Sequence, residues 1–230
     1  MLLTGPYPRE GSRDYALRMI TQNIVSLALV PGSRVSEAEL AEQMGLSRTP
    51  VREALHELDK SGIVKVSPQR GTEVSYIDYA VLDEIMFLRS SLECSVLRVL
   101  CALPGPLPLE ELEDNLLLEQ RAAARDDREA LMQLDNEFHR LLFCLAGKRR
   151  VYELMAGSMA LLDRERTLSL SLMRQYDFVA DHAALLKALR AQNADEALEV
   201  MQFHLSRYQA DKPMLLGACP QYFAPGDAAR

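Results

Sequence analysis

The chain has 230 residues, of which 48% are hydrophobic and 26% charged, a balance typical of a globular protein with two domains. No apolar run approaches the roughly 18 residues that a membrane-spanning helix needs. Residues 1–13 lack the apolar segment of an export signal, so we expect a cytoplasmic protein. The four cysteines include no C-x-x-C pair, which excludes a cysteine-rich zinc site and a disulfide scaffold.

The net charge of −7 is unusual for a nucleic-acid-binding protein, but it is unevenly distributed along the chain. Residues 1–75 contain nine Lys and Arg against nine Asp and Glu, whereas residues 76–230 contain 17 against 24 and carry the whole excess. A basic cluster in the first part can therefore bind phosphate although the chain as a whole is acidic. The composition leaves DNA binding open.

The first part of the chain has the pattern of short helices. An apolar face at helical spacing predicts a helix that begins at Arg13 and ends at Pro31. Ser36 and Glu39 form a capping box that begins a second, shorter helix, which ends at Gly45. A tight turn containing this glycine then leads into a third helix.

The third helix and the segment after it complete a known DNA-binding arrangement. Ser47 caps this helix, which ends at Ser61. Two β-prone runs, residues 63–66 and 72–76, follow on either side of the turn residues 67–71 and predict a hairpin. Two helices joined by a tight turn and followed by a hairpin predict a winged helix-turn-helix, in which the third helix reads DNA.

Polar and cationic side chains gather where this domain would meet DNA. Arginine suits bidentate contact with a guanine edge, and hydroxyl groups at a helix N-terminus suit phosphate. The candidates are Ser47, Arg48, Thr49 and Arg52 at the start of the third helix, Arg70 and Gly71 at the hairpin tip, and Arg34 and Lys65 as weaker phosphate contacts. The alternative is that Arg48 and Arg52 form a solvated face paired with Glu53 and Glu57.

Residues 31–74 resemble the GntR family of bacterial transcription regulators over their full length. The core of residues 46–55, LSRTPVREAL, is close to the signature of that family. The resemblance implies that five of the candidates fall on positions that contact operator DNA, namely Ser47, Arg48, Thr49, Arg52 and Gly71. His56 stands where the family usually has Arg or another long polar residue, and we expect it to face solvent.

Beyond residue 78 the pattern is helical only. Six amphipathic stretches are predicted as helices, at residues 79–102, 109–126, 128–146, 150–172, 178–191 and 194–208. A proline-rich segment, residues 103–108, separates the first two. The expected fold is mainly α, with a winged helix-turn-helix and small β-hairpin in residues 1–76 and an all-helical antiparallel bundle for effector binding and dimerisation in residues 77–230.

Three of the four histidines lie on the apolar faces of three different helices of the bundle. They are His139, His182 and His204, and Asp135 lies one helical turn before His139. Burying a carboxylate and three imidazoles is costly unless they are paired or bind a metal, and one shared metal would satisfy all four. The alternative for each residue alone is a hydrogen-bonded core histidine or a plain Asp–His ion pair.

The spacing of these residues resembles the FCD effector domain of FadR-like GntR regulators over about residues 78–211. That domain has Asp-x-x-x-His on one helix and single histidines on two later helices, which here are Asp135 with His139, then His182 and His204. Three imidazoles and one carboxylate suit Zn or Ni among the divalent ions. If the coordination is octahedral, two positions remain open for a small organic acid.

Two arginines are candidates for binding that acid. Arg89 lies inside the apolar face of its predicted helix, and a buried guanidinium needs a carboxylate, either Glu93 one turn later or a ligand. In the resembling family the equivalent arginine points into the effector cavity, which favours the ligand. Arg164, which can share a face with Leu161 and Leu168, is a second candidate.

The sequence therefore predicts a ligand-responsive transcription regulator of the GntR type, a homodimer that binds a palindromic operator and is not an enzyme. One alternative is a regulator in which the metal is purely structural. Another is a metal-dependent enzyme acting on small carboxylic acids, but the sequence has no convincing general base beside the site and no nucleophile motif.

Overall fold

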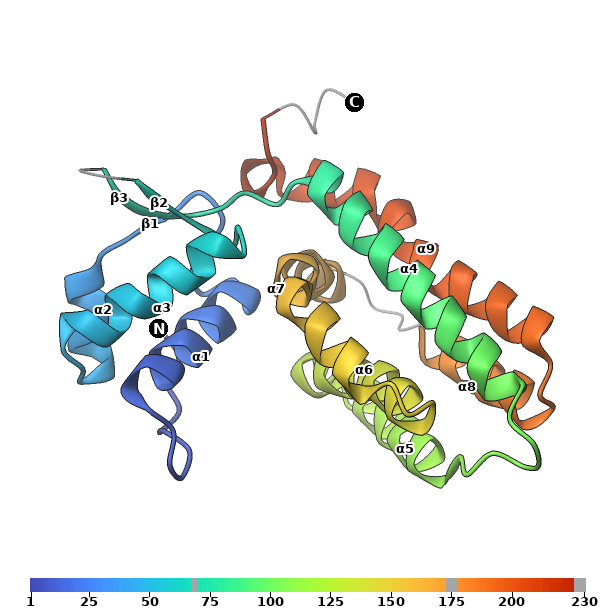
Figure 1. The fold of residues 1–230 in the computed structure, drawn as a ribbon. Coiled ribbons are helices and arrows are strands. Elements are labelled where there is room, and N and C mark those ends of the chain that lie inside the picture. The colour runs from blue at the N-terminus through green and yellow to red at the C-terminus, as the bar shows by residue number, and fades with distance from the viewer. Residues whose placement is uncertain (68–69, 173–177, 226–230) are drawn as a thin grey trace. The chain divides into compact units, whose positions relative to one another are not determined.

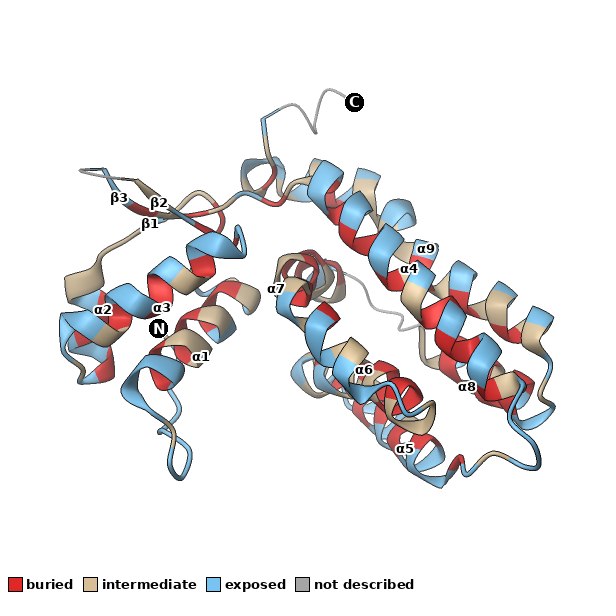
Figure 2. Ribbon diagram, in the orientation of Figure 1, coloured by how far each residue is buried: buried red, intermediate tan, exposed pale blue. Residues whose placement is uncertain are grey.

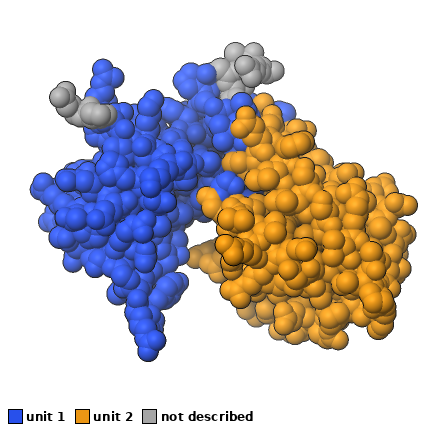
Figure 3. Space-filling view, in the orientation of Figure 1, with its two compact units in different colours: residues 1–82, 158–168, 213–230 blue, residues 83–157, 169–212 orange. Residues whose placement is uncertain are grey.

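The chain packs into two compact units, each built from segments that are distant in the sequence (Figure 3). The computed structural model describes residues 1–67, 70–172 and 178–225. Unit 1 comprises Met1–Leu82, Ser158–Leu168 and Pro213–Arg230, and unit 2 comprises Asp83–Gly157 and Ser169–Lys212. Three long helices of the described residues therefore contribute to both units, and the expected functional division after residue 76 stays a prediction.

Unit 1 contains the predicted helix-turn-helix and hairpin (Figure 1). Its first elements are α1 (Ser12–Val25), β1 (Arg34–Val35), α2 (Glu37–Met44), α3 (Arg48–Lys60), β2 (Val64–Ser67) and β3 (Gly71–Val74). The three strands form an antiparallel sheet in the order β1-β3-β2. Strand β1, which the sequence analysis missed, pairs with the hairpin through Arg34 opposite Glu73 and Val35 opposite Thr72.

The end of α1 differs from the prediction. The helix ends at Val25 and not at Pro31, because Leu27 adopts a left-handed backbone conformation with φ of 59°. The N–H of Leu29 then bonds back to the carbonyl of Asn23 at 2.8 Å, which closes the helix end.

The core of unit 1 forms where α1 and α3 pack against each other and against the hairpin. The apolar stripes that predicted these helices are buried, and the main core residues are Tyr15, Met19, Ile20, Ile24, Val51, Leu55, Ile63 and Val74. Between α2 and α3, Gly45 has φ of 65°, and the N–H of Leu46 bonds to the carbonyl of Ala41 at 2.9 Å. This left-handed turn sets the direction of α3.

The remaining elements are helical, as predicted. They are α4 (Tyr79–Cys101), α5 (Glu110–Ala124), α6 (Arg128–Leu145), α7 (Arg149–Leu172), α8 (Phe178–Arg190), α9 (Ala194–Ala218) and a short 3-10 helix, Pro220–Tyr222. The predicted end of the last α-helix at Tyr208 is wrong, because α9 continues through Pro213 and buries Leu215 completely. No helix in the described residues is long and apolar enough to cross a membrane.

The helices of unit 2 bury one side and expose the other (Figure 2). Fully buried apolar side chains include Leu97, Leu100, Leu131, Phe138, Phe143 and Leu189. Among them lie charged and polar side chains from α4, α5, α6 and α8, so this core is not purely apolar. Buried charges of this kind need specific partners.

Two glycine substitutions test the role of backbone conformation. Gly45→Ala is expected to lower the free energy of unfolding by about 1–2 kcal/mol, because an L-residue is strained at positive φ. Gly157→Ala, inside α7, is expected to raise it by about 0.5–1 kcal/mol, because glycine weakens a helix interior. An added Cβ meets open space at both positions, so contacts do not differ. Urea unfolding followed by circular dichroism measures both, and effects of the same sign would contradict this account.

Candidate metal centre and nucleic-acid interface

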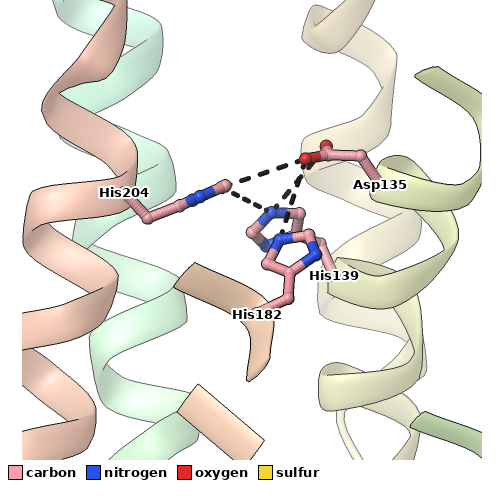
Figure 4. A group of neighbouring side chains, drawn as sticks. All are labelled: Asp135, His139, His182 and His204. Atoms are coloured by element: carbon pink, nitrogen blue, oxygen red, sulfur yellow. Dashed lines mark hydrogen bonds and ion pairs between the residues drawn. The ribbon is translucent and has the colours of Figure 1, made fainter. Parts of the chain in front are cut away.

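Four side chains predicted to hold a metal converge inside unit 2 (Figure 4). Asp135 and His139 come from α6, His182 from α8 and His204 from α9. One ligand atom from each lies within 4.8 Å of the others. The side chains are between 1% and 9% exposed, so the cluster is closed off from bulk water. A buried Asp/His cluster of this kind can bind a metal ion.

Each histidine of the cluster is held from behind by a carboxylate. The Nδ1–oxygen distances are 2.6 Å for His139 and Glu93, 2.9 Å for His182 and Glu119, and 3.4 Å for His204 and Asp181. Because an ionised carboxylate only accepts hydrogen bonds, each Nδ1 carries the proton, and Nε2 of the neutral ring keeps its lone pair. Carboxylates in this position are typical of metal-binding histidines, whose orientation and basicity they fix.

The three Nε2 atoms point into the centre of the cluster. Nε2 of His139 lies 3.2 Å from Nε2 of His204, a contact between two lone pairs that is repulsive unless a cation lies near both. Nε2 of His182 is buried and has no hydrogen-bond partner among the residues that the structure describes. Oxygens of Asp135 lie 3.7 to 4.0 Å from the three nitrogens, beyond hydrogen-bond distance. Atoms at about 2.1 Å from a common ion lie roughly 3 to 4 Å apart, so these residues fit a metal.

Burial also keeps the cluster in the protonation state that a metal requires. It lowers the pKa of His139 well below 6.5, and the charge of Arg89 acts in the same direction. Burial likewise lowers the pKa of His204, so both rings are neutral near pH 7. Burial alone would raise the pKa of Asp181, but hydrogen bonds from His204 and Arg207 outweigh it and lower that pKa to about 2.

Arg89 is connected to the cluster through Glu93. Its guanidinium is buried, and Nε donates to Oε1 of Glu93 at 2.6 Å. The other oxygen of the same carboxylate faces Nδ1 of His139. Of the two partners considered for this arginine, Glu93 is thus in contact with it, and a charged chain leads from α4 to the predicted metal ligand on α6.

The sequence analysis missed two carboxylates behind the histidines, Glu119 and Asp181. Glu119 lies on the buried face of α5 with Leu112, Asn115 and Ala122, and it is completely buried. A charged residue within an apolar stripe was therefore a usable signal. Burial raises the pKa of Glu119, and its hydrogen bond with His182 opposes that rise. Asp181 directly precedes His182 in the sequence, and its position alone does not indicate that it contacts His204.

Arg164 does not lie with the cluster. It belongs to unit 1, whereas the four cluster residues belong to unit 2. Its side chain is buried and donates to the backbone carbonyls of Ser75 at 2.5 Å and Tyr76 at 3.5 Å. Burial lowers the pKa of Arg164 to about 10. This arginine therefore fixes the segment between β3 and α4.

All of the predicted DNA-binding residues are exposed. They are Arg34 in β1, Ser47, Arg48, Thr49 and Arg52 at the start of α3, Lys65 in β2, and Arg70 and Gly71 before and at the start of β3. Ser47 has the N-cap position of α3, but its side chain makes no capping hydrogen bond. Pro68 and Gln69 of the predicted hairpin turn lie outside the described residues. His56 is exposed, as expected.

Arg52 has a different partner from those considered in the sequence. Its guanidinium lies 3.0 Å from Oε2 of Glu37, at the first position of α2, and not against Glu53 or Glu57. The Arg52 side chain is still 58% exposed. This ion pair links α2 to α3 and restricts the orientation of the Arg52 guanidinium, which stays accessible to solvent.

Comparisons with known proteins identify the families that the two parts of the chain match. Residues 14–74 match the family described as bacterial regulatory proteins, gntR family, and residues 84–207 match the FCD domain. An uncharacterized HTH-type transcriptional regulator from an unstable DNA locus of Streptomyces ambofaciens is 36% identical over 96% of this chain and 92% of the relative. The HTH-type transcriptional repressor RspR of Escherichia coli is 28% identical over 86% of this chain and 87% of the relative.

Solved structures show the same fold. The chain superposes on E. coli McbR/YncC with a TM-score of 0.74 at 23% identity, covering 90% of this chain and 98% of that chain. A GntR transcriptional regulator from Rhodococcus sp. RHA1 gives a TM-score of 0.73 with the same identity and coverage.

Metal binding by the cluster is tested by replacing one histidine. We expect the full chain to bind one divalent ion, and His204→Ala to weaken that binding at least about 100-fold because one ligand is lost. His56→Ala, which removes an exposed histidine on α3, should leave it unchanged. Titration with zinc against a competing chelator measures both affinities. Equal affinity of the two variants would contradict a site at the cluster.

Proposed function

The chain belongs to the GntR family of bacterial transcription regulators and carries an FCD domain of the FadR-like branch, and from this premise we propose that it is a ligand-responsive regulator that senses a small organic acid. The family consists of DNA-binding regulators, not enzymes, so the enzyme considered from the sequence is set aside. The observation that carries the proposal is the buried Asp/His cluster with Arg89 behind it.

The proposed DNA contacts lie on α3 and the wing. Ser47, Arg48 and Thr49 lie at the start of α3 and present two hydroxyls, a guanidinium and the backbone N–H groups of a helix N-terminus, which suit phosphate and base edges in the major groove. Arg70 and Gly71 lie at the tip of the hairpin, where the backbone can approach a sugar-phosphate chain. A homodimer would present two such surfaces to a palindromic operator.

Replacing Arg52 tests the DNA contacts. Arg52→Ala is expected to weaken binding to DNA from upstream of the protein's own gene about 10- to 100-fold, because one guanidinium that can reach a base is lost. The fold should be retained, since the side chain is 58% exposed. Gel-shift titration at fixed salt measures the affinity.

The control for Arg52→Ala is Arg149→Ala, which removes the same charge from an exposed ion pair in unit 2. This variant should bind DNA as the wild type does. Unchanged affinity of Arg52→Ala, or its unfolding, would contradict the role proposed for Arg52.

For the effector site, we propose that a divalent ion, Zn or Ni, is held by Asp135 and the three histidines. When bound, it supplies a Lewis-acidic centre for the oxygens of a small carboxylate. Arg89 contributes a positive charge on the α4 side of the cluster, and Glu93 orients it by the 2.6 Å hydrogen bond. An arriving carboxylate can compete with Glu93 for this guanidinium, and that competition would couple effector binding to α4.

A second candidate function for the cluster is purely structural. It is favoured by the same ion pair, because Glu93 already neutralises Arg89 without a ligand. Chelation of the metal separates the two candidates. Loss of the helical fold points to a structural ion, whereas loss of acid binding with the fold retained supports a sensor.

Thermal unfolding with small carboxylic acids, from acetate to citrate, tests the effector site. We expect one of these acids to raise the Tm of the metal-loaded protein by several degrees at a hundred times its Kd. Asp135→Ala removes a metal ligand and Arg89→Ala removes the proposed anchor, so both should abolish the rise. Arg149→Ala should retain it. A rise that survives in Arg89→Ala would contradict the role of that arginine.

A further inference from the structure

Helix α4 exposes a stripe of side chains on the side opposite Arg89 and Glu93. The stripe comprises Glu84, Phe87, Ser91, Ser95 and Arg98, all exposed and spaced by three, four, four and three residues, so they lie on one face of the helix. Phe87 is 77% exposed, which is unusual for so large an apolar side chain. All five residues belong to unit 2.

A hollow lies beside this phenylalanine. It has a volume of about 400 Å³ and is lined by Phe87 itself, Ser91, Ser95 and Arg98 of α4 and by Gln202 of α9, among others. The two helices run side by side in unit 2 (Figure 1). The serines that line the hollow are small, whereas the Phe87 side chain is large and 77% exposed. One surface therefore carries both a protruding group and a recess.

The stripe matches a second, antiparallel copy of itself in both size and charge. In two antiparallel copies of a helix, residues whose numbers have a constant sum lie opposite each other. With Ser91 opposite Ser91 of the second copy, Phe87 lies opposite Ser95 and Glu84 lies opposite Arg98. Each contact then occurs twice: an aromatic ring over a small residue, and a carboxylate beside a guanidinium. In the described part of the chain, neither Glu84 nor Arg98 forms an ion pair, so both charges are available to a partner.

We propose that the α4 stripe is an interface between two copies of this chain, packed antiparallel around a twofold axis at Ser91. The small serines let the helix axes approach to about 8 Å, and each Phe87 enters the hollow of the other copy. The inference rests on the homodimer of the proposed function and adds its surface and register. It also gives α4 two roles, since its buried face holds the Arg89–Glu93 pair beside the histidine cluster.

A disulfide across the axis tests the register directly. Ser91→Cys places two thiols within reach of each other, because residue 91 faces its own copy. Ser95→Cys is the control: its copies are offset by eight residues, or about 12 Å along the helix, beyond the roughly 7 Å that a disulfide allows between Cα atoms. Mild oxidation of the full chain should crosslink the first variant and leave the second at the wild-type level. Equal crosslinking of both variants would overturn the register.

The contacts themselves are tested by sedimentation of the full chain. Phe87→Asp should raise the Kd of the dimer at least about 100-fold, since the ring is lost twice. Leu154→Asp, at a side chain that is also 77% exposed in unit 2, should leave the Kd unchanged. Glu84→Arg and Arg98→Glu should each weaken the dimer about tenfold, and the double variant Glu84→Arg/Arg98→Glu should restore it.

The outcomes separate this inference from the proposed function. If Phe87→Asp dimerises like the wild type, or the double charge reversal fails to restore the dimer, the interface is wrong, and gel-shift binding by the wild type still supports the regulator. If the α4 variants dissociate as expected but the wild type binds no upstream DNA, the interface stands and the proposed function fails. A wild type that is monomeric at all concentrations overturns the interface and the dimeric operator complex together.

Discussion

Three imidazole rings and one carboxylate lie together in unit 2, with at most 9% of each side chain exposed and one ligand atom from each within 4.8 Å of the others. The Nδ1 protons of His139, His182 and His204 are directed to carboxylates, so the lone pairs of the Nε2 atoms all face inward. Two of these nitrogens are only 3.2 Å apart, and the third has no hydrogen-bond partner in the described part of the chain. A cation at the centre converts this repulsive arrangement into a stable one, and it would link α6, α8 and α9.

The need to hold these histidines in place also explains buried charges on the surrounding helices. Glu93 of α4 and Glu119 of α5 are completely buried, or nearly so, because each supports a histidine of another helix. Five of the six helices with residues in unit 2 therefore contribute a charged or titratable group to one cluster. Helix α4 has two functional faces in this account. Its buried face carries Arg89 and Glu93, which contacts His139, and its opposite face carries the exposed Phe87 stripe. If effector binding displaces Arg89, the movement has to cross only the width of α4 to affect the proposed interface with a second copy.

The positions of the helices, and the burial of Asp135 and the three histidines, could be predicted from the sequence because the spacing of apolar residues is a local signal. Asp135 and His139 are one turn apart on a strongly amphipathic helix, and that spacing alone brings them together. The partners from other helices could not be derived in this way: Glu119 contacts His182 only because α5 packs beside α8. Arg164 has apolar neighbours at helical spacing, yet tertiary packing gives it the carbonyls of the segment before α4. Strand β1, with two residues, is too short to produce a pattern.

The central claim is that a metal ion lies among Asp135 and the three histidines. X-ray diffraction from crystals of the protein, measured on both sides of the absorption edge of the bound metal, tests it most directly. We expect a single anomalous peak in each copy of unit 2, at about 2.0–2.2 Å from the three Nε2 atoms and an oxygen of Asp135. Crystals grown with zinc that show no peak there, with the Nε2 atoms of His139 and His204 hydrogen-bonded to each other through a proton, would contradict the claim.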